Sequence, residues 1–199
     1  MTGRVLIPIG DAAEAIDTLY PLYRVREDGF EAVVAGPEAR TYQLVMHEIP
    51  PGWDITREGP SYHLKAHTAF RDVDPAQFTG LFLTGGRAPE YLRYDPALMR
   101  IVRYFFAESK PVGVVCHGAE IVAAAGVIDG KRLATVPKCR MDIELCGATF
   151  VDDSCVIDGN MVSGRTWHDQ DRYMREFMKM LHAQAARERN AAQLDYSRI

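Results

Sequence analysis

The chain has little of what marks a nucleic-acid-binding, membrane or secreted protein. Its 199 residues contain 23 Lys and Arg against 27 Asp and Glu, for a net charge of −4, so we expect no basic surface for nucleic acid. No apolar run approaches the roughly 20 residues that cross a bilayer. The apolar stretch within Met1–Gly10 is too short for a signal sequence. We therefore expect one cytoplasmic domain with no nucleic-acid or membrane partner.

Cysteine is scarce as well. The four cysteines are Cys116, Cys139, Cys146 and Cys155, and they lack the paired short spacing of a zinc site. In a reducing compartment they should be free thiols rather than disulfides. We expect three of them to be packing residues and predict no metal site.

Short apolar runs alternate with helical patterns along most of the chain. Strands are predicted at Val5–Ile9, Ala32–Ala35, Gly80–Thr84 and Pro111–Val115, and helices at about 17–28, 90–109 and 117–125. The first helix should start near Asp17 or Thr18, because Pro21 is tolerated in a first turn. Gly126 is the expected stop of the third. This alternation predicts an α/β sandwich with a mostly parallel central sheet, covered by helices on both faces.

Two other segments depart from the alternation. Residues 38–78 contain turn-rich stretches and predict inserted loops with a small β-hairpin. Residues 155–163 predict a second hairpin, with its turn at Asp158–Asn160. We assign residues 1–187 to a single domain and residues 188–199 to a C-terminal tail. Tyr173, Phe177 and Leu181 should line the buried face of the last helix.

Cys116 occupies the most informative position in the sequence. It ends the apolar run Pro111–Val115 and is followed by His117, Gly118 and a helical pattern. A strand, a sharp turn and a helix present a side chain at a helix N-terminus, as in a nucleophile elbow. Free N–H groups and the helix dipole favour an anion there, so we expect this thiol to ionise more easily than a free cysteine.

Three distant segments should meet at one edge of the sheet. Glu14, Gly85–Gly86 and Cys116 each follow a predicted strand by a few residues. In open α/β sheets, sites form beyond the carboxyl ends of the strands. The sequence therefore predicts a site at this edge, with Cys116 as its nucleophile.

At this point the sequence resembles the ThiJ/PfpI superfamily, within the flavodoxin-like, class I glutamine amidotransferase-like fold. The matching pieces are Glu14 before Tyr20–Pro21, Gly85–Glu90, Val115–Gly118 and Asp158–Asn160. Many members have Pro where this chain has Thr84, a departure that affects turn stiffness more than mechanism. The match spans nearly the whole chain apart from the C-terminal tail.

The resemblance implies roles for several residues. Cys116 would be the nucleophile, with Glu14 as a protonated carboxyl beside its sulfur. The backbone N–H groups of Gly86 and His117 would form an oxyanion hole. In the peptidase branch His117 would pair with the cysteine and be oriented by Glu90 from another subunit. That arrangement implies a homo-oligomer, a dimer or a hexamer.

Plainer interpretations stand beside these roles. Glu14 could be an ordinary helix N-terminal charge, Gly85–Gly86 a tight turn, His117 a capping residue and Glu90 a solvated side chain. Gly85, Arg87 and His168 are candidates for lining the pocket, although His168 fits a surface or core histidine better.

The resemblance implies a cysteine enzyme that needs no cofactor. Our leading hypothesis is a glyoxalase III-like or deglycase activity on small α-oxoaldehydes, converting methylglyoxal to lactate through a Cys116 hemithioacetal. The inserted loops should narrow access to Cys116, which suits a small aldehyde. The alternatives are a PfpI-type intracellular peptidase that uses Cys116, His117 and Glu90 on a peptide substrate, and a non-hydrolytic redox-stress sensor or chaperone.

Overall fold

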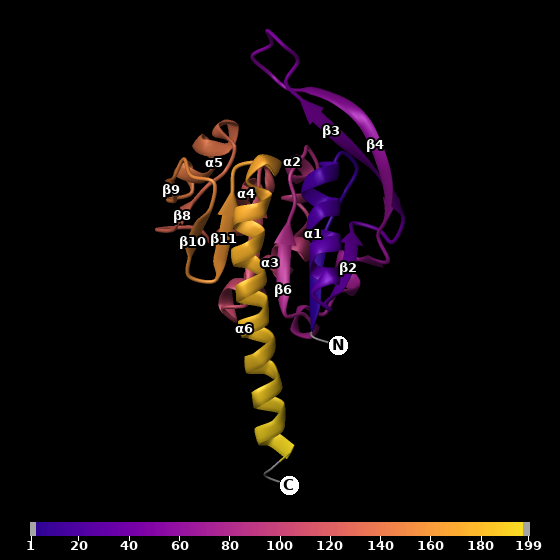
Figure 1. Cartoon of the computed structure of the whole chain (residues 1–199), viewed down its shortest axis with the longest axis vertical. Helices are drawn as coiled ribbons and strands as arrows, with labels where there is room; N and C mark the ends of the chain where they lie inside the picture. Colours follow the sequence, from indigo (N-terminus) through magenta and orange to yellow (C-terminus); the bar gives the residue numbers. More distant parts are fainter. Residues whose placement is uncertain (1–2, 197–199) are drawn as a thin grey trace.

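A central sheet of seven strands organises the chain (Figure 1). The computed structural model describes residues 3–196. In spatial order the strands are β10 (Val156–Asp158), β11 (Met161–Gly164), β7 (Val112–Val115), β6 (Gly80–Leu83), β1 (Arg4–Pro8), β2 (Glu31–Gly36) and β5 (Thr68–Ala69). All neighbouring pairs are parallel except β10 with β11. The predicted α/β fold with a mostly parallel sheet is confirmed.

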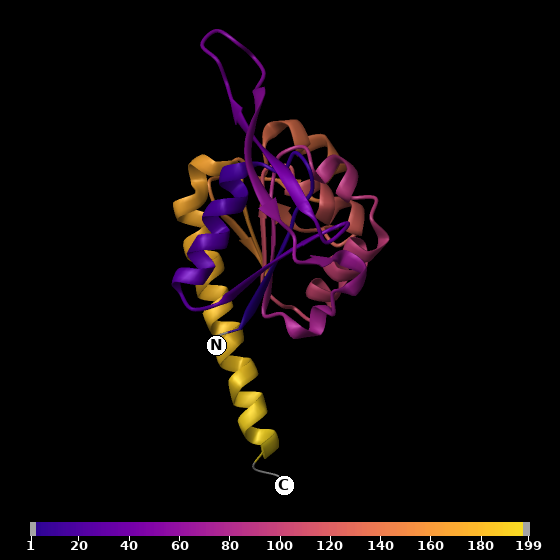
Figure 2. The same ribbon diagram turned by 90° about the vertical axis from the view of Figure 1, so that its right-hand side faces the viewer.

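Helices cover both faces of this sheet (Figures 1 and 2). Helices α1 (Ala15–Glu27) and α6 (Gln170–Tyr196) pack on one face, and α3 (Pro96–Ala107) and α4 (Gly118–Ala125) on the other. Aromatic packing holds α6 to the sheet, because Phe82 of β6 stacks on Tyr173 and meets the edge of Phe177. All three rings are completely buried, so α6 is part of the core over its first three turns.

Two predicted helices have different boundaries in the structure. Helix α1 begins at Ala15, with Glu14 as its N-cap and Pro21 inside it. The prediction of a start at residue 17 or 18 was wrong, because packing of the helix outweighs the backbone hydrogen bond that a proline removes. The helix predicted at 90–109 is broken into α2 (Pro89–Leu92) and α3. Asp95 caps α3 by accepting hydrogen bonds from two backbone N–H groups, just before Pro96.

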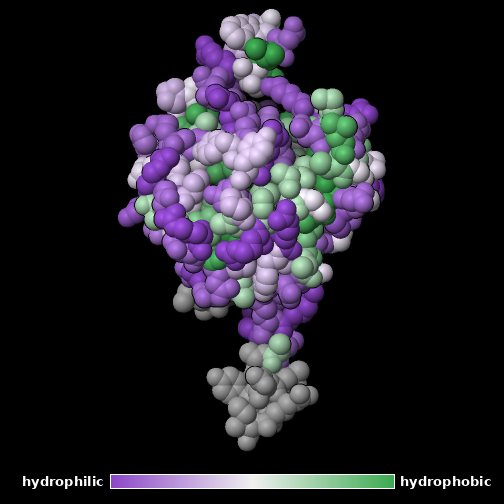
Figure 3. All heavy atoms as spheres, turned by 180° about the vertical axis from the view of Figure 1, so that it is seen from behind, coloured by the Kyte–Doolittle hydropathy of each residue, from purple (hydrophilic) through white to green (hydrophobic). Residues whose placement is uncertain are grey.

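The inserted segment forms an antiparallel hairpin of β3 (Thr41–Glu48) and β4 (Arg57–Lys65). It projects beyond the body of the molecule in Figures 1 and 2. Its far end exposes Ile49, Trp53 and Ile55, and apolar residues lie among polar ones there in Figure 3. Its base is tied to the domain by a bridge between Val45 and Glu14. A hairpin in the insertion was predicted, but its reach was not.

The remaining elements are short. They are β8 (Arg132–Leu133), β9 (Thr149–Phe150), α5 (Arg140–Leu145) and the 3-10 helices η1 (Phe70–Asp72), η2 (Pro75–Gln77), η3 (Pro137–Cys139) and η4 (Trp167–Asp169). Gly126 ends α4 in the left-handed conformation with φ 70°, as predicted. Most of the tail predicted at 188–199 is helical, because α6 reaches Tyr196, and residues 197–199 lie outside the described part. Among the described helices, none combines the length and the apolar character that a bilayer crossing requires.

Candidate active site

Cys116 lies in a sharp turn between β7 and α4. Its φ is +55°, in the left-handed region that side chains other than glycine rarely adopt. Buried β-branched residues make β7 a central strand, and Gly118 allows α4 to pass close to β6, since a Cβ there would lie 2.7 Å from the Leu83 carbonyl oxygen. The strand, turn and helix predicted around Cys116 are confirmed. The strained backbone at this residue is typical of a nucleophile elbow.

The sulfur of Cys116 is enclosed by polar groups. Cys116 is only 6% exposed, and the nearby backbone N–H groups of Gly86 and His117 act to lower the pKa of its thiol. The Nδ1 atom of His117 lies 3.3 Å from Sγ. Burial raises the pKa of the Cys116 thiol well above its usual range and the nearby Asp17 adds to the rise, while the two N–H donors oppose it. The expectation of an easily ionised thiol was therefore wrong, because desolvation outweighs the helix N-terminus.

Asp17 is the carboxyl that lies close to the sulfur. It is completely buried on α1. A Cβ built on Gly85 would lie 2.5 Å from both Asp17 Oδ2 and Cys116 Cβ, so the three residues share one small space. Burial, reinforced by the charge of Glu14, raises the pKa of Asp17 to about 8. The Oδ2 atom has no hydrogen-bond partner among the described residues, and Asp17 is thus protonated at neutral pH.

Glu14 has a different partner from the one predicted. Its carboxylate is 2.5 Å from Nδ1 of His47, and Nε2 of His47 is 3.2 Å from Glu58 on the facing strand of the hairpin. The hydrogen bond to Glu14 raises the pKa of His47. The carboxyl near the sulfur is thus that of Asp17, whereas the predicted Glu14 pairs with His47. Glu14 is the N-cap of α1 and contacts the hairpin. Asp17, one turn further along α1, lies near Cys116.

Sequence reasoning missed Asp17, His47 and Glu58. For Asp17 a signal existed, because it is spaced by four and eight residues from Pro21 and Val25, which are buried on the same helix. Acidic residues rarely occupy the buried face of a helix, so an Asp at this spacing indicates a functional or structural role. His47 and Glu58 had no local signal, since the contact depends on the register of the hairpin.

The Gly85–Gly86 turn brings backbone close to the nucleophile. Gly86 has φ +83°, and a Cβ there would lie 2.3 Å from the backbone nitrogen of Glu14. Only glycine fits this position. The turn passes close to the sulfur, since a Cβ built on Gly85 would lie 3.0 Å from Cys116 Sγ, and the Gly86 and His117 N–H groups both act to lower the pKa of the thiol. The two donors predicted to form an oxyanion hole are therefore adjacent to the reactive atom.

The other predicted site residues lie further from the sulfur. Arg87 and Glu90 are exposed and paired, with 3.6 Å between Nε and the carboxylate, and Arg87 also donates to Glu58. Within residues 3–196, no hydrogen bond joins Glu90 to His117. His168 is exposed and its Nδ1 lies 3.1 Å from Thr166 Oγ1. A triad completed by Glu90 of a second subunit, and a pocket role for His168, stay predictions.

His117 is half-buried and its environment favours the neutral ring. Burial lowers its pKa, and the charge of Lys138 lowers it further. A neutral imidazole next to a protonated thiol has the protonation states of a general base and its proton donor. The arrangement of thiol, imidazole and buried carboxyl is suited to addition of sulfur to an electrophilic carbon, followed by proton transfers.

One cluster around the site has the donor atoms of a metal centre. Ligand atoms of His117, Glu120 and Cys139 all lie within 4.8 Å of one another. The spacing of the cysteines in the sequence gave no sign of it.

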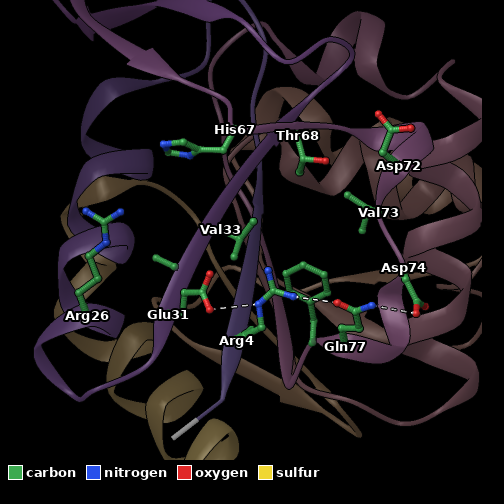
Figure 4. A pocket seen from close by; sticks show the side chains of 12 residues that line it. Arg4, Arg26, Glu31, Val33, His67, Thr68, Asp72, Val73, Asp74 and Gln77 are labelled. Carbon is green, nitrogen blue, oxygen red and sulfur yellow. Dashed lines mark hydrogen bonds and ion pairs between the residues drawn. The ribbon is translucent and has the colours of Figure 1, made fainter. Parts of the chain in front are cut away.

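A cavity of about 510 Å³ lies away from this site, beside β2 and β5 (Figure 4). Arg4 lies in it and is bound by Glu31 and Gln77, with its guanidinium over the ring of Phe78. These contacts hold the Arg4 guanidinium in place beside the cavity. It contains neither Cys116 nor its neighbours.

Comparison with known proteins places the chain among relatives of similar length. The model of the DJ-1/PfpI family matches residues 3–180. A protein of Thermococcus kodakarensis named a deglycase is 36% identical over 178 residues, which cover 89% of this chain and 99% of that protein. The Deglycase PfpI of Pyrococcus furiosus is 34% identical over the same shares. The crystal structure of Drosophila melanogaster DJ-1beta superposes with a TM-score of 0.76 at 18% identity, covering 98% of both chains.

Proposed function

The chain belongs to the DJ-1/PfpI family, and from this premise we propose that it is a cysteine enzyme acting on small α-oxoaldehydes without a cofactor. The proposal is of the glyoxalase III or deglycase type, with methylglyoxal converted to lactate. One observation carries it: the Cys116 sulfur lies 3.3 Å from the His117 ring and close to the buried Asp17. The deglycase names of the relatives support an enzyme of the deglycase type.

The first step is addition of sulfur to the aldehyde carbon. Because burial raises the pKa of Cys116 and lowers that of His117, the resting pair is a thiol and a neutral imidazole. His117 accepts the thiol proton as the carbon–sulfur bond forms. The aldehyde oxygen gains the negative charge, and the N–H groups of Gly86 and His117 are the nearest donors for it. The product is a hemithioacetal on Cys116.

The second stage moves hydrogen between the two carbons. His117 returns its proton to the new alkoxide and then removes the C–H proton, which gives an enediol. Reprotonation of the neighbouring carbon gives a thioester of the hydroxy acid, and water hydrolyses it to release lactate and the thiol. Asp17, protonated below about pH 8, donates its proton to the ketone oxygen as the enediol forms and takes up the proton of the C1 hydroxyl as the thioester forms. The oxidation of one carbon balances the reduction of the other, so no external oxidant is required.

Methylglyoxal turnover by protein treated with a chelator tests this proposal. Wild type should produce lactate without glutathione, whereas Cys116→Ala should fall to the uncatalysed rate. Cys155→Ser is the matched control, because this cysteine is only partly buried and directly precedes the edge strand β10. Equal turnover by wild type and Cys116→Ala would refute the proposal.

The peptidase alternative has one observation in its favour. Glu90 is exposed on α2, and its charge within the same chain favours protonation of His117. A peptide chloromethyl ketone that labels Cys116 in wild type and fails to label Glu90→Gln would favour this second function. The redox-sensor alternative depends on an acidic thiol, which burial of Cys116 opposes.

A further inference from the structure

Three residues beside the nucleophile offer nitrogen, oxygen and sulfur ligands to one point. His117 precedes α4, Glu120 lies one turn further on in that helix, and Cys139 ends η3. Their ligand atoms are within 4.8 Å of one another. Imidazole, carboxylate and thiolate are the ligands that Zn²⁺ binds in proteins, and three of them with an open fourth position form a common coordination set.

Glu120 is a buried carboxylate with an unused oxygen. It is 8% exposed, and its Oε1 accepts a long contact of 3.7 Å from the thiol of Cys139, which is 1% exposed. Its Oε2 has no hydrogen-bond partner among the described residues. The guanidinium of Arg93 is 3.4 Å from that oxygen without forming a hydrogen bond. This oxygen has an ion pair but accepts no hydrogen bond, a costly state for a buried carboxylate that a directly bound cation would relieve.

Charges of both signs surround the cluster, because Lys138 opposes protonation of His117 whereas Glu90 and Asp142 favour it. Arg93 lies between Glu120 and Asp142, at 3.4 and 3.8 Å from the two carboxylates, so two acidic groups face one guanidinium. His117 is half-buried and forms the side of the cluster that is open to solvent. The cluster therefore combines two buried ligands with one that solvent reaches in part.

We propose that His117, Glu120 and Cys139 form a Zn²⁺ site that switches off the nucleophile. The metal would be held by one ring nitrogen of His117, a carboxylate oxygen of Glu120 and the Cys139 thiolate, whose proton is released to solvent. The ring nitrogen that binds the metal cannot accept a proton, and the other nitrogen of the neutral ring already carries one. Because Cys116 is 3.3 Å from this ring, the occupied site removes its base. The inhibition rests on the proposed function, whereas the binding does not.

Direct binding measurements separate the two parts. Metal-free wild type, titrated with Zn²⁺ against a chromophoric chelator, should bind one ion per chain. Cys139→Ser should weaken binding by at least about 100-fold, because the loss of partners that only orient metal ligands already costs about 10- to 100-fold. Cys146→Ser is the matched control, since this thiol is exposed, and should bind as wild type. Wild-type affinity in Cys139→Ser would overturn the site.

A cobalt spectrum identifies which thiol binds the metal. In the Cys116→Ala background, Co²⁺ should give thiolate-to-metal charge-transfer absorption that disappears when Cys139 is also changed to Ser. Absorption that requires Cys116 instead would overturn the assignment. Zn²⁺ should inhibit methylglyoxal turnover of wild type reversibly, with chelator restoring it. Zn²⁺ that binds through Cys139 yet leaves turnover unchanged would refute the switch while the binding site stands.

Discussion

Asp17→Asn should remove a large pH dependence from the stability of the fold. The carboxyl is completely buried, and its pKa is raised from 3.8 to about 8. Because the folded pKa lies above the unfolded one, the folded state keeps a proton that the unfolded chain releases. Stability from this residue therefore falls as pH rises from about 4 to about 8, and each pKa unit corresponds to about 1.36 kcal/mol. Between pH 5 and pH 8 the loss should be roughly 3 to 4 kcal/mol.

Urea denaturation of wild type and Asp17→Asn at pH 5, 6.5 and 8 measures this difference. Asn cannot ionise, and its amide N–H can face the sulfur as the protonated carboxyl does, so the variant should gain on wild type steadily with pH. Asp54→Asn, at an exposed position in the loop of the hairpin, should follow wild type at each pH. Parallel pH profiles for wild type and Asp17→Asn would refute the buried, protonated carboxyl.

Three further predictions concern the same site. Gly85→Ala should lower turnover about 100-fold, measured as methylglyoxal consumption, because the new Cβ would lie 2.5 Å from the Cβ of Cys116. Near-normal turnover would show that the space between Gly85 and Cys116 is not restricted. His47→Gln should destabilise the fold by about 1 to 3 kcal/mol below pH 6.5 and by less at higher pH, measured from urea midpoints. The reason is that the pKa of His47 is raised, so its bond to Glu14 is strongest where the ring is protonated. A loss of stability that grows with pH would contradict this. His117→Gln should lower turnover about 10²- to 10⁴-fold and slow iodoacetamide labelling of Cys116 at pH 7, and unchanged labelling would show that His117 is not its base.

Local patterns in the sequence were enough to predict the scaffold. The short β-branched runs and the helical patterns between them gave the parallel sheet, and the run from Pro111 to Gly118 gave the elbow at Cys116. These features depend on neighbours in the chain, on periodicity and on residues such as Gly126 that have one favoured place. The family followed from the same motifs, and the match of residues 3–180 confirms it.

The length of the helices and the charge state of the thiol could not be predicted in this way. Pro21 suggested a late start for α1, but burial of this helix against the sheet allows a proline within it. Sequence placed Cys116 at a helix N-terminus, which favours the anion, and the fold then enclosed its sulfur. Desolvation depends on every element packed around an atom, so it has no signature in a short motif.

The sequence by itself determined that a cysteine would stand at the head of a helix at the carboxyl edge of a parallel sheet. Tertiary structure decided which groups meet it there. It assigned Glu14 to His47 of the hairpin, brought Asp17 close to the sulfur and assembled His117, Glu120 and Cys139. Strands and helices arise from contacts a few residues apart, whereas the identity of a neighbour across the core depends on helix rotation and hairpin register, which only the packed chain fixes.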